Sequence, residues 1–286
     1  MKATSRTLIQ PTELLSILRG ASPRTVVLDC RFSLLDTQAG RSKYEEGHLP
    51  GARYAHLDDD LSGPVIPGQT GRHPLPDPED LARRLGSWGI DAETFVVCID
   101  DVGGAFAARA WWLLRWLGHE EVAVLDGGMQ AWTAAGGALE TAEVTPAPRR
   151  FEARPRPETL ATQDDVAAGR WRRLVDSREA TRYRGETEPI DSVAGHIPGA
   201  INRPFQTNLD GGRFKTEDAL RSEFEPLMAD LESPSDAVFY CGSGVTAAHN
   251  VLAALHAGWG EARLYNGSWS EWIADGTRTV ATGDEG

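Results

Sequence analysis

The sequence predicts an α/β protein built from two similar domains in tandem, each a parallel sheet flanked by helices. An internal repeat places the motif Gly-His-Leu/Ile-Pro-Gly-Ala after two aspartates, with its histidine 19 residues after Asp29 and 20 residues after Asp176. Short β-branched runs alternate with longer amphipathic runs, which is typical of strands joined by helices. The length of 286 residues also suits two domains of ordinary size.

In the first domain, three unbroken apolar runs predict strands that are buried on both faces of a parallel sheet. They cover residues 25–28, 95–99 and 122–125. Residues 105–117, between the second and third runs, are apolar on nearly all sides and too long for a strand, so we expect a buried helix there. The tryptophans of that helix recur at helical spacing and are assigned to the core: Trp111, Trp112 and Trp116.

The second domain is expected to follow the same order. Residues 173–176 repeat the first strand of the first domain, the apolar run at residues 237–241 predicts a further strand, and residues 246–256 predict the counterpart of the buried helix. Residues 140–157 carry four prolines and four arginines without apolar periodicity, which suits a semi-extended linker. We therefore predict a domain at residues 1–139, a linker at residues 140–157 and a domain at residues 158–286.

The composition excludes several classes of function. Forty-two acidic and 29 basic residues give a formal net charge of −13, which disfavours nucleic acid and anionic membranes as partners. No run is apolar enough to span a bilayer, and the N-terminus lacks the pattern of a secretory signal. Three cysteines are too few for a disulfide framework, so we expect free thiols and a cytoplasmic location. No metal-ligand spacing is present, and we expect no metal and no cofactor.

Cys241 is the strongest candidate for a reactive residue. It ends an apolar run and is followed by Gly-Ser-Gly-Val-Thr before the predicted helix. Two glycines let such a loop curl so that several N–H groups point inward at an anion, and the helix N-terminus adds its positive dipole end. The same surroundings favour a thiolate. The simplest alternative is a buried structural thiol, which is how we interpret Cys30 and Cys98, because neither is followed by such a loop.

The first domain provides an internal control. Aligning the two central strands places Asp100 at the position of Cys241. An aspartate cannot act as a sulfur nucleophile, so we predict a catalytically inactive first domain and one active site per chain.

The cysteine loop and the two histidine motifs together resemble the two-domain rhodanese-type sulfurtransferases, over nearly the whole chain. The loop is closest to that of the 3-mercaptopyruvate branch, because the thiosulfate branch carries basic residues where Gly242 and Ser243 stand here. The resemblance implies two tandem rhodanese-like domains and an enzyme that moves sulfane sulfur through a persulfide on Cys241. The acceptor would be a thiol, such as that of thioredoxin, or cyanide.

The resemblance also assigns roles to individual residues. Arg182 matches an arginine that binds the substrate carboxylate, and His73 and Asp58 fall where this branch carries a histidine and an acid that work with the loop serine, here Ser243. The loop residues that match the sulfur-holding amides are Gly242, Gly244, Val245 and Thr246.

The family's second carboxylate-binding arginine has no counterpart. Residues 188–191 occupy its stretch, so either Arg182 acts alone or Arg184 or Arg203 substitutes for the missing group.

The sequence is also compatible with alternative functions. The histidine motifs are mostly architectural, and His73 could be a solvated loop residue. A cysteine phosphatase needs an arginine six residues after the cysteine, where this chain has Ala247, so phosphatase activity is disfavoured. Thiosulfate is the alternative sulfur donor, and a non-catalytic sulfur-carrier module is the alternative to an enzyme. We predict a preference for 3-mercaptopyruvate because Gly242 and Ser243 supply no cation for a dianion.

Overall fold

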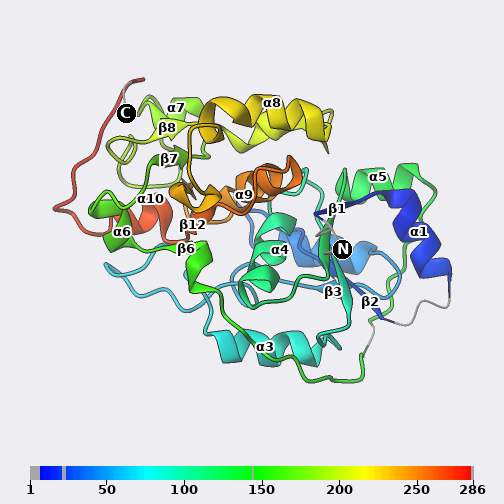
Figure 1. Cartoon of the computed structure of the whole chain (residues 1–286). Coiled ribbons are helices and arrows are strands. Elements are labelled where there is room, and N and C mark those ends of the chain that lie inside the picture. Colours follow the sequence, from blue (N-terminus) through cyan, green and yellow to red (C-terminus); the bar gives the residue numbers. More distant parts are fainter. Residues whose placement is uncertain (1–6, 21–23, 144, 285–286) are drawn as a thin grey trace. The chain divides into compact units, whose positions relative to one another are not determined.

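The computed structural model describes residues 7–20, 24–143 and 145–284 (Figure 1). Within these ranges the chain forms two parallel five-stranded sheets and one two-stranded hairpin. The predicted domain ends at residues 1–6 and 285–286, and residue 144 of the predicted linker, lie outside the described residues. The α/β class and the two domains with parallel sheets flanked by helices are as predicted. None of the described helices has the length and apolarity needed to cross a membrane.

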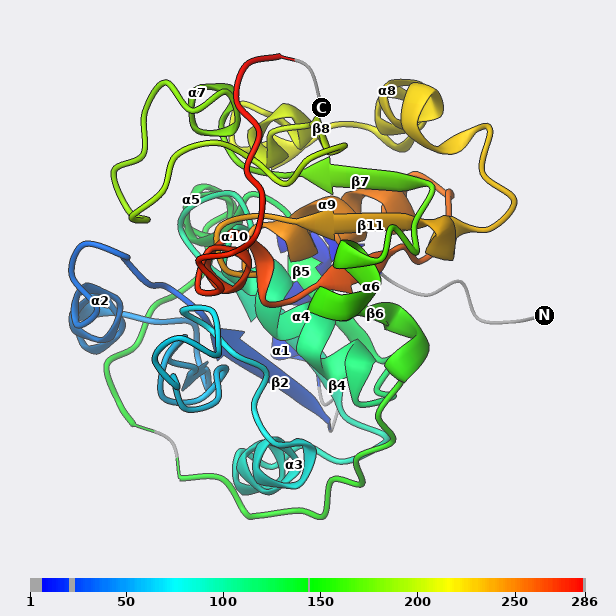
Figure 2. The ribbon, with the colours of Figure 1, turned by 90° about the vertical axis from the view of Figure 1, so that its left-hand side faces the viewer.

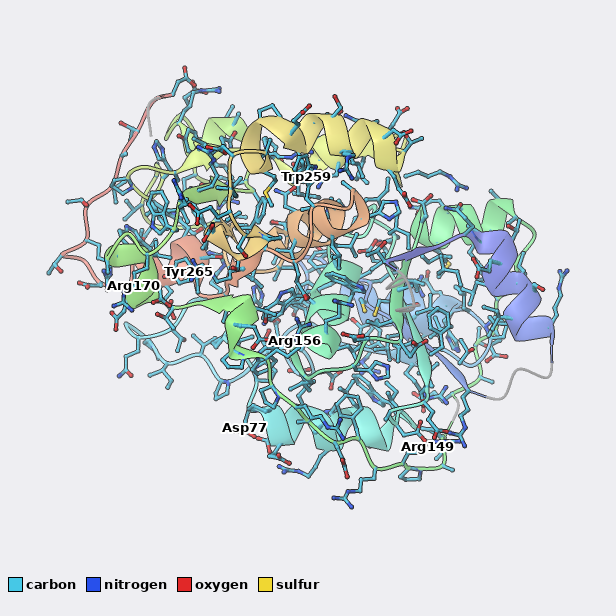
Figure 3. The ribbon with its side chains drawn as sticks, in the orientation of Figure 1. Asp77, Arg149, Arg156, Arg170, Trp259 and Tyr265 are labelled. Carbon is cyan, nitrogen blue, oxygen red and sulfur yellow. The ribbon has the colours of Figure 1, made fainter. Side chains whose placement is uncertain are left out.

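The first compact unit comprises residues 1–62 and 76–156. Its strands, in sheet order, are β1 (Leu8–Ile9), β5 (Val122–Leu125), β4 (Phe95–Ile99), β2 (Thr25–Asp29) and β3 (Arg53–Tyr54). Its helices are α1 (Pro11–Arg19), α2 (Ala39–Glu46), α3 (Pro78–Ser87), α4 (Ala107–Trp116) and α5 (Gly128–Ala134). Helix α3 begins as its sequence dictates, because the carboxylate of Asp77 accepts from the N–H groups of Glu79 and Asp80 (Figure 3).

The second unit comprises residues 63–75 and 157–286. Its sheet order is β6 (Leu160–Ala161), β12 (Arg263–Tyr265), β11 (Ala237–Tyr240), β7 (Arg173–Asp176) and β8 (Ile201–Asn202), and β9 (Leu209–Asp210) pairs with β10 (Arg213–Phe214). Its helices are α6 (Gln163–Ala167), α7 (Ala180–Tyr183), α8 (Glu217–Met228), α9 (Ala247–His256) and α10 (Ser268–Trp272). Figure 2 shows β7 beside β11 at the centre of this sheet. Trp259 lies between α8 and α9, and its indole donates to the carbonyl of Arg221 (Figure 3).

The two units differ from the predicted domains in two segments. The sequence placed residues 63–75 in the first domain, whereas their contacts assign them to the second unit. Residues 140–156 of the predicted linker belong to the first unit, where the N–H of Arg149 donates to the carbonyl of Gly86 at 2.8 Å. Both assignments depend on contacts between residues far apart in the sequence, which composition does not reveal.

Each histidine motif holds a loop against its own sheet. The ring of His48 stacks on Tyr44 with centroids 3.9 Å apart, and the ring of His196 stacks on Tyr183 at 3.8 Å. In both cases Nδ1 lies 2.8 Å from the carbonyl oxygen of that tyrosine. Both histidines are fully buried, so their contacts support the architectural interpretation.

A buried ion pair recurs beside each motif. Arg31 contacts Asp29 at 2.6 Å in the first unit, and Arg178 contacts Asp176 at 2.6 Å in the second. Each guanidinium also donates to the carbonyl just before the motif's histidine, which satisfies a second buried acceptor. The loops that follow β2 and β7 are therefore fixed in the same way in both units.

The core of the first unit includes the predicted buried helix. Trp111 and Trp112 of α4 are fully enclosed and Trp116 is nearly so, as expected. The helix begins at Ala107, two residues later than predicted, because Asp100 binds the N–H groups at its start. Cys98 lies inside β4 and Cys30 directly after β2, and both are buried free thiols.

Candidate active site

Cys241 lies directly after β11, the central strand of the second sheet, and only 2% of its surface is exposed. Its backbone is fixed by the loop that follows β12. The N–H of Cys241 donates to Ser268 Oγ at 3.1 Å, and its carbonyl accepts from the N–H of Trp269 at 3.0 Å. The carbonyl of Gly242 accepts from the N–H of Ser270 at 2.9 Å. Hydrogen bonds to both its N–H and its carbonyl therefore fix the backbone of Cys241.

The loop from Cys241 to α9 has the curled backbone that its glycines predict. Gly244 adopts φ +77°, and a side chain there would strike the carbonyl of Asn266, so glycine is required on two counts. Among the described residues, no protein group accepts from the N–H groups of Ser243, Gly244 or Val245. Together with the start of α9 at Ala247, these donors can hold an anionic sulfur.

Residues 63–75 are packed against the loop after β12 by specific contacts. The N–H of Arg72 donates to Ser270 Oγ at 3.1 Å, and Asn266 Nδ2 donates to the carbonyl of His73 at 3.2 Å. Gly71 has no room for a side chain, because a Cβ there would lie 2.5 Å from the carbonyl oxygen of Gly267. The loop that fixes Cys241 thus also fixes Arg72 and His73.

His73 and Ser243 are brought together. His73 Nδ1 lies 2.7 Å from Ser243 Oγ, and both side chains are buried. A neutral imidazole with its proton on Nε2 accepts this hydrogen bond from the serine hydroxyl, so the pair can pass a proton to or from a group bound beside the loop. The third member of the predicted relay, Asp58, belongs to the first unit, where its N–H donates to His56 Nδ1 at 3.2 Å. Its link to His73 stays a prediction.

Two arginines flank Gly242, the residue after the cysteine. A Cβ built on Gly242 would lie 2.8 Å from Arg72 Nη2 and 3.6 Å from Arg182 Nη2. The sequence identified Arg182, which lies in α7, but gave no role to Arg72. As the sequence indicates, the side chains of residues 242 and 243 supply no cation, whereas Arg182 from α7 and Arg72 from segment 63–75 place guanidinium groups next to Gly242.

Two buried carboxylates face these arginines. Arg182 contacts Glu188 at 2.7 Å and Asp191 at 3.1 Å, and Arg72 pairs with the other oxygen of Asp191. Both carboxylate side chains are only 4% exposed. Burial raises the pKa of Asp191 despite the neighbouring arginines. Burial also acts to raise the pKa of Glu188, but the hydrogen bonds from Arg182 and the backbone outweigh it, so the pKa of that carboxyl is lowered.

The two arginines proposed as substitutes for the missing one lie elsewhere. Arg184 is paired with Glu186 at the surface, with Nε and Oε1 2.7 Å apart. Arg203 donates to Asn208 Oδ1 at 2.8 Å and stacks over the ring of Phe224. Neither adjoins Gly242. In the sequence, the indication of a role for Arg72 is that it directly precedes His73. The position of that segment is defined by contacts with residues far along the chain.

The charges around Gly242 balance. Arg178 also contacts Glu188, at 3.3 Å, so one network contains three arginines and three carboxylates. Its members are Arg72, Arg178, Arg182, Asp176, Glu188 and Asp191. With every member ionised the network is neutral, which favours a singly charged ligand over a dianion. Among the described residues, no cluster of three or more His, Cys, Asp or Glu side chains is placed to hold a metal ion.

Comparison with known proteins identifies the family. The rhodanese-like domain family matches residues 10–135 and 160–275. The chain is 50% identical over 271 residues to a Pseudomonas aeruginosa protein named "Probable 3-mercaptopyruvate sulfurtransferase", covering 93% of this chain and 95% of that one. It is 34% identical over 256 residues to the chicken (Gallus gallus) thiosulfate sulfurtransferase, covering 86% of each chain. The structure of a 3-mercaptopyruvate sulfurtransferase from Leishmania major superimposes with a TM-score of 0.83 and 31% identity, covering 95% of this chain and 75% of that one. The chain therefore belongs to the rhodanese family, as a sulfurtransferase with two rhodanese-like domains.

Proposed function

We propose that the chain transfers sulfur from 3-mercaptopyruvate to a thiol or cyanide through a persulfide on Cys241. The observation that carries this proposal is the 2.7 Å contact between His73 Nδ1 and Ser243 Oγ, two residues beyond the cysteine. A donor with a thiol proton needs a group that can take that proton and return it to the leaving carbon. Thiosulfate needs no such group, because sulfite leaves without gaining a proton.

The first half-reaction balances without any added reagent. The Cys241 thiolate attacks the sulfur of the donor, the carbon–sulfur bond breaks, and its electron pair leaves with the enolate of pyruvate. The proton of the donor thiol passes to Ser243 and His73 and returns to the methylene carbon, which gives pyruvate and an anionic persulfide. The N–H groups of residues 243–245, which have no protein acceptor in the described part of the chain, and the N-terminus of α9 are suited to stabilising that charge. A positioned acid–base group typically contributes about 10²–10⁴-fold to such a step.

The second half-reaction returns the enzyme to its starting state. An acceptor thiolate attacks the outer sulfur of the persulfide, the sulfur–sulfur bond breaks, and the electron pair returns to Cys241 as a thiolate. Cyanide reacts in the same way and leaves as thiocyanate. We expect a small thiol or thioredoxin as the acceptor in the cytoplasm, since the three free cysteines suit a reducing compartment.

We further propose that the first domain is inactive and each chain has one active site. Asp100 follows β4 as Cys241 follows β11, and both strands are central in their sheets. The Asp100 carboxylate fills its own loop, so that loop has neither a nucleophile nor open donors for an anionic sulfur. The alternative donor, thiosulfate, is supported by the arginines beside Gly242 and opposed by the neutral network around them.

The test is the intact mass of the protein after incubation with 3-mercaptopyruvate. The parent protein is expected to gain one sulfur atom, and addition of cyanide is expected to remove it and release thiocyanate. Cys241→Ser should gain nothing, while Cys98→Ala serves as the matched control and should gain the same mass as the parent. A gain that persists in Cys241→Ser excludes the site, and a persulfide that forms without repeated turnover favours a sulfur carrier over an enzyme.

A further inference from the structure

Arg72 and Arg182 approach one carboxylate from two separate segments of the chain. Arg72 pairs with Oδ1 of Asp191, and Arg182 Nη2 lies 3.1 Å from Oδ2. Both guanidinium groups also border Gly242, the neighbour of the nucleophile. The two guanidinium groups that share the Asp191 carboxylate are thus arranged to bind a carboxylate group, next to the residue that follows Cys241.

Arg72 has an unused donor. Its Nε is enclosed by protein, yet this atom has no hydrogen-bond partner in the described part of the chain. A buried N–H without an acceptor costs free energy, so its presence calls for an explanation such as a ligand that accepts from it. Its side chain also keeps 29% of its surface exposed, compared with 4% for Asp191.

The surroundings of Asp191 and of its neighbour Glu188 shift the pKa values of the two carboxyl groups in opposite directions. Burial raises the pKa of Asp191, whereas hydrogen bonds from Arg182 and backbone N–H groups lower the pKa of Glu188. The groups that face Asp191 are Arg72, Arg178, Arg182 and Glu188. Because Asp191 contacts both Arg72 and Arg182, it is the acid with which another carboxylate would compete for these two arginines.

We propose that Arg72 is the second donor-binding arginine of this site, and that Asp191 is a built-in counter-ion that keeps Arg72 and Arg182 aligned for the carboxylate of an α-keto thiol. This inference rests on the proposed function and extends it. An arginine from segment 63–75 takes the place of the family's second arginine, and an acid stands where that arginine is expected. The neutral network admits one added negative charge, as 3-mercaptopyruvate supplies, more readily than two.

The experiment compares two donors that carry the same transferable sulfur. Mercaptoacetone has a methyl group in place of the carboxylate of 3-mercaptopyruvate. For Arg72→Gln, KM for 3-mercaptopyruvate is expected to rise about tenfold or more, the usual effect of losing a hydrogen bond to a charged group, with kcat changed far less. KM for mercaptoacetone should stay at the parent value. Arg72→Lys should recover only part of the loss, because an ammonium cannot form two parallel hydrogen bonds.

Two further variants test whether the effect is specific to Arg72 and whether Asp191 acts as a counter-ion. Arg184→Gln, which removes the surface arginine paired with Glu186, is the matched control and should leave both donors unchanged. Asp191→Asn removes one negative charge between the arginines, and KM should fall for 3-mercaptopyruvate but not for mercaptoacetone. An unchanged or higher KM for 3-mercaptopyruvate in Asp191→Asn would overturn the role of Asp191 as a competing counter-ion.

The outcomes separate this inference from the proposed function. If the parent transfers sulfur from 3-mercaptopyruvate but Arg72→Gln leaves its KM unchanged, or affects both donors equally, Arg72 does not bind the carboxylate. If the parent transfers no sulfur from 3-mercaptopyruvate, the proposed function fails. Calorimetric titration with pyruvate then still tests the binding of a keto-acid carboxylate without turnover. Weaker pyruvate binding by Arg72→Gln than by Arg184→Gln supports the assignment, and equal binding contradicts it.

Discussion

Asp100 and Cys241 occupy the same place in two units with the same strand order, and only one of them leaves its loop open to a ligand. The two carboxylate oxygens of Asp100 accept from four backbone N–H groups, those of Val102, Gly104, Phe106 and Ala107, at 2.8–3.0 Å. In the second unit, the N–H groups of residues 243–245 have no protein partner among the described residues. The first unit thus shows a protein carboxylate bound where the second unit is proposed to hold an anionic sulfur.

The basic residues near the two loops, Lys43 and Arg182, can be compared in the same way. Lys43 precedes Tyr44 as Arg182 precedes Tyr183, and its ammonium contacts Asp101 at 2.5 Å, directly after Asp100. The position that corresponds to Asp101 is Gly242 in the second unit, which carries no side chain. In the first unit the basic residue therefore pairs with the acid that follows Asp100, whereas in the second unit Arg182 pairs with Glu188 and Asp191, and its guanidinium borders Gly242 together with that of Arg72.

The largest effect is expected at the nucleophile. Cys241→Ser should reduce sulfur transfer to the uncatalysed background, because a hydroxyl of much higher pKa cannot hold a transferable sulfur. The measurement is the rate of pyruvate and thiocyanate formation, with the thermal unfolding midpoint as the check on folding. Cys30→Ala and Cys98→Ala should lose stability at most. Residual activity in Cys241→Ser together with loss of activity in Cys98→Ala would move the active site to the first unit.

Substitution of Asp100 is expected to lower the stability of the protein without abolishing persulfide formation. In Asp100→Asn the amide nitrogen cannot accept from Phe106 and Ala107, so two buried N–H groups lose their acceptor. The free energy of unfolding should fall by about 2–4 kcal/mol, measured by urea denaturation. The persulfide mass gain should persist in the folded fraction. A variant as stable as the parent would contradict the structural role given to this carboxylate.

The sequence predicted what depends on local pattern and missed what depends on long-range contact. The strand before Cys241 and its loop follow from an apolar run and two glycines, and the buried helix follows from the spacing of Trp111, Trp112 and Trp116. Arg72 could not be found in this way, because its backbone is fixed by Ser270, 198 residues further along the chain. Segment 63–75 has no apolar periodicity to indicate where it packs.

The acids beside Arg182 illustrate a second limit. The sequence showed that residues 188–191 replace the stretch of an expected arginine, and it suggested Arg184 and Arg203 as substitutes. It could not show that Asp191 faces two arginines at once, since one of them lies more than one hundred residues earlier. Charge at a position is visible in a sequence, but the partners of that charge depend on the fold.

A smaller effect is expected when Arg182 is made to resemble Lys43 of the first unit. Arg182→Lys should raise KM for 3-mercaptopyruvate by about tenfold and lower kcat less, because an ammonium cannot grip a carboxylate with two parallel hydrogen bonds. Steady-state kinetics measure both constants. The remaining Arg72 should preserve part of the binding, so the double variant with Arg72→Gln is expected to lose more than either single variant. An unchanged KM in Arg182→Lys would exclude this arginine from donor binding.

The smallest expected effect concerns the choice of donor. The parent should have a higher kcat/KM for 3-mercaptopyruvate than for thiosulfate, since the network around Gly242 is neutral and Ser243 with His73 serves a donor that carries a proton. The double variant Gly242→Arg/Ser243→Lys adds two cations and removes the serine. Its ratio of the two efficiencies should shift severalfold towards thiosulfate, because added positive charge favours the dianion.

The position of Arg72 leads to a further expectation for the double variant Gly242→Arg/Ser243→Lys. A side chain at residue 242 would begin 2.8 Å from Arg72 Nη2, so an arginine there must displace Arg72 from the site. The double variant should therefore have a lower kcat/KM for 3-mercaptopyruvate and a higher kcat/KM for thiosulfate. If displacement of Arg72 causes the loss with 3-mercaptopyruvate, that loss should be as large as the loss in Arg72→Gln. High salt should weaken the gain with thiosulfate, since ions screen the added charges. If the parent has a higher kcat/KM for thiosulfate than for 3-mercaptopyruvate, the donor assignment is wrong. The proposed persulfide on Cys241 is not affected by that result.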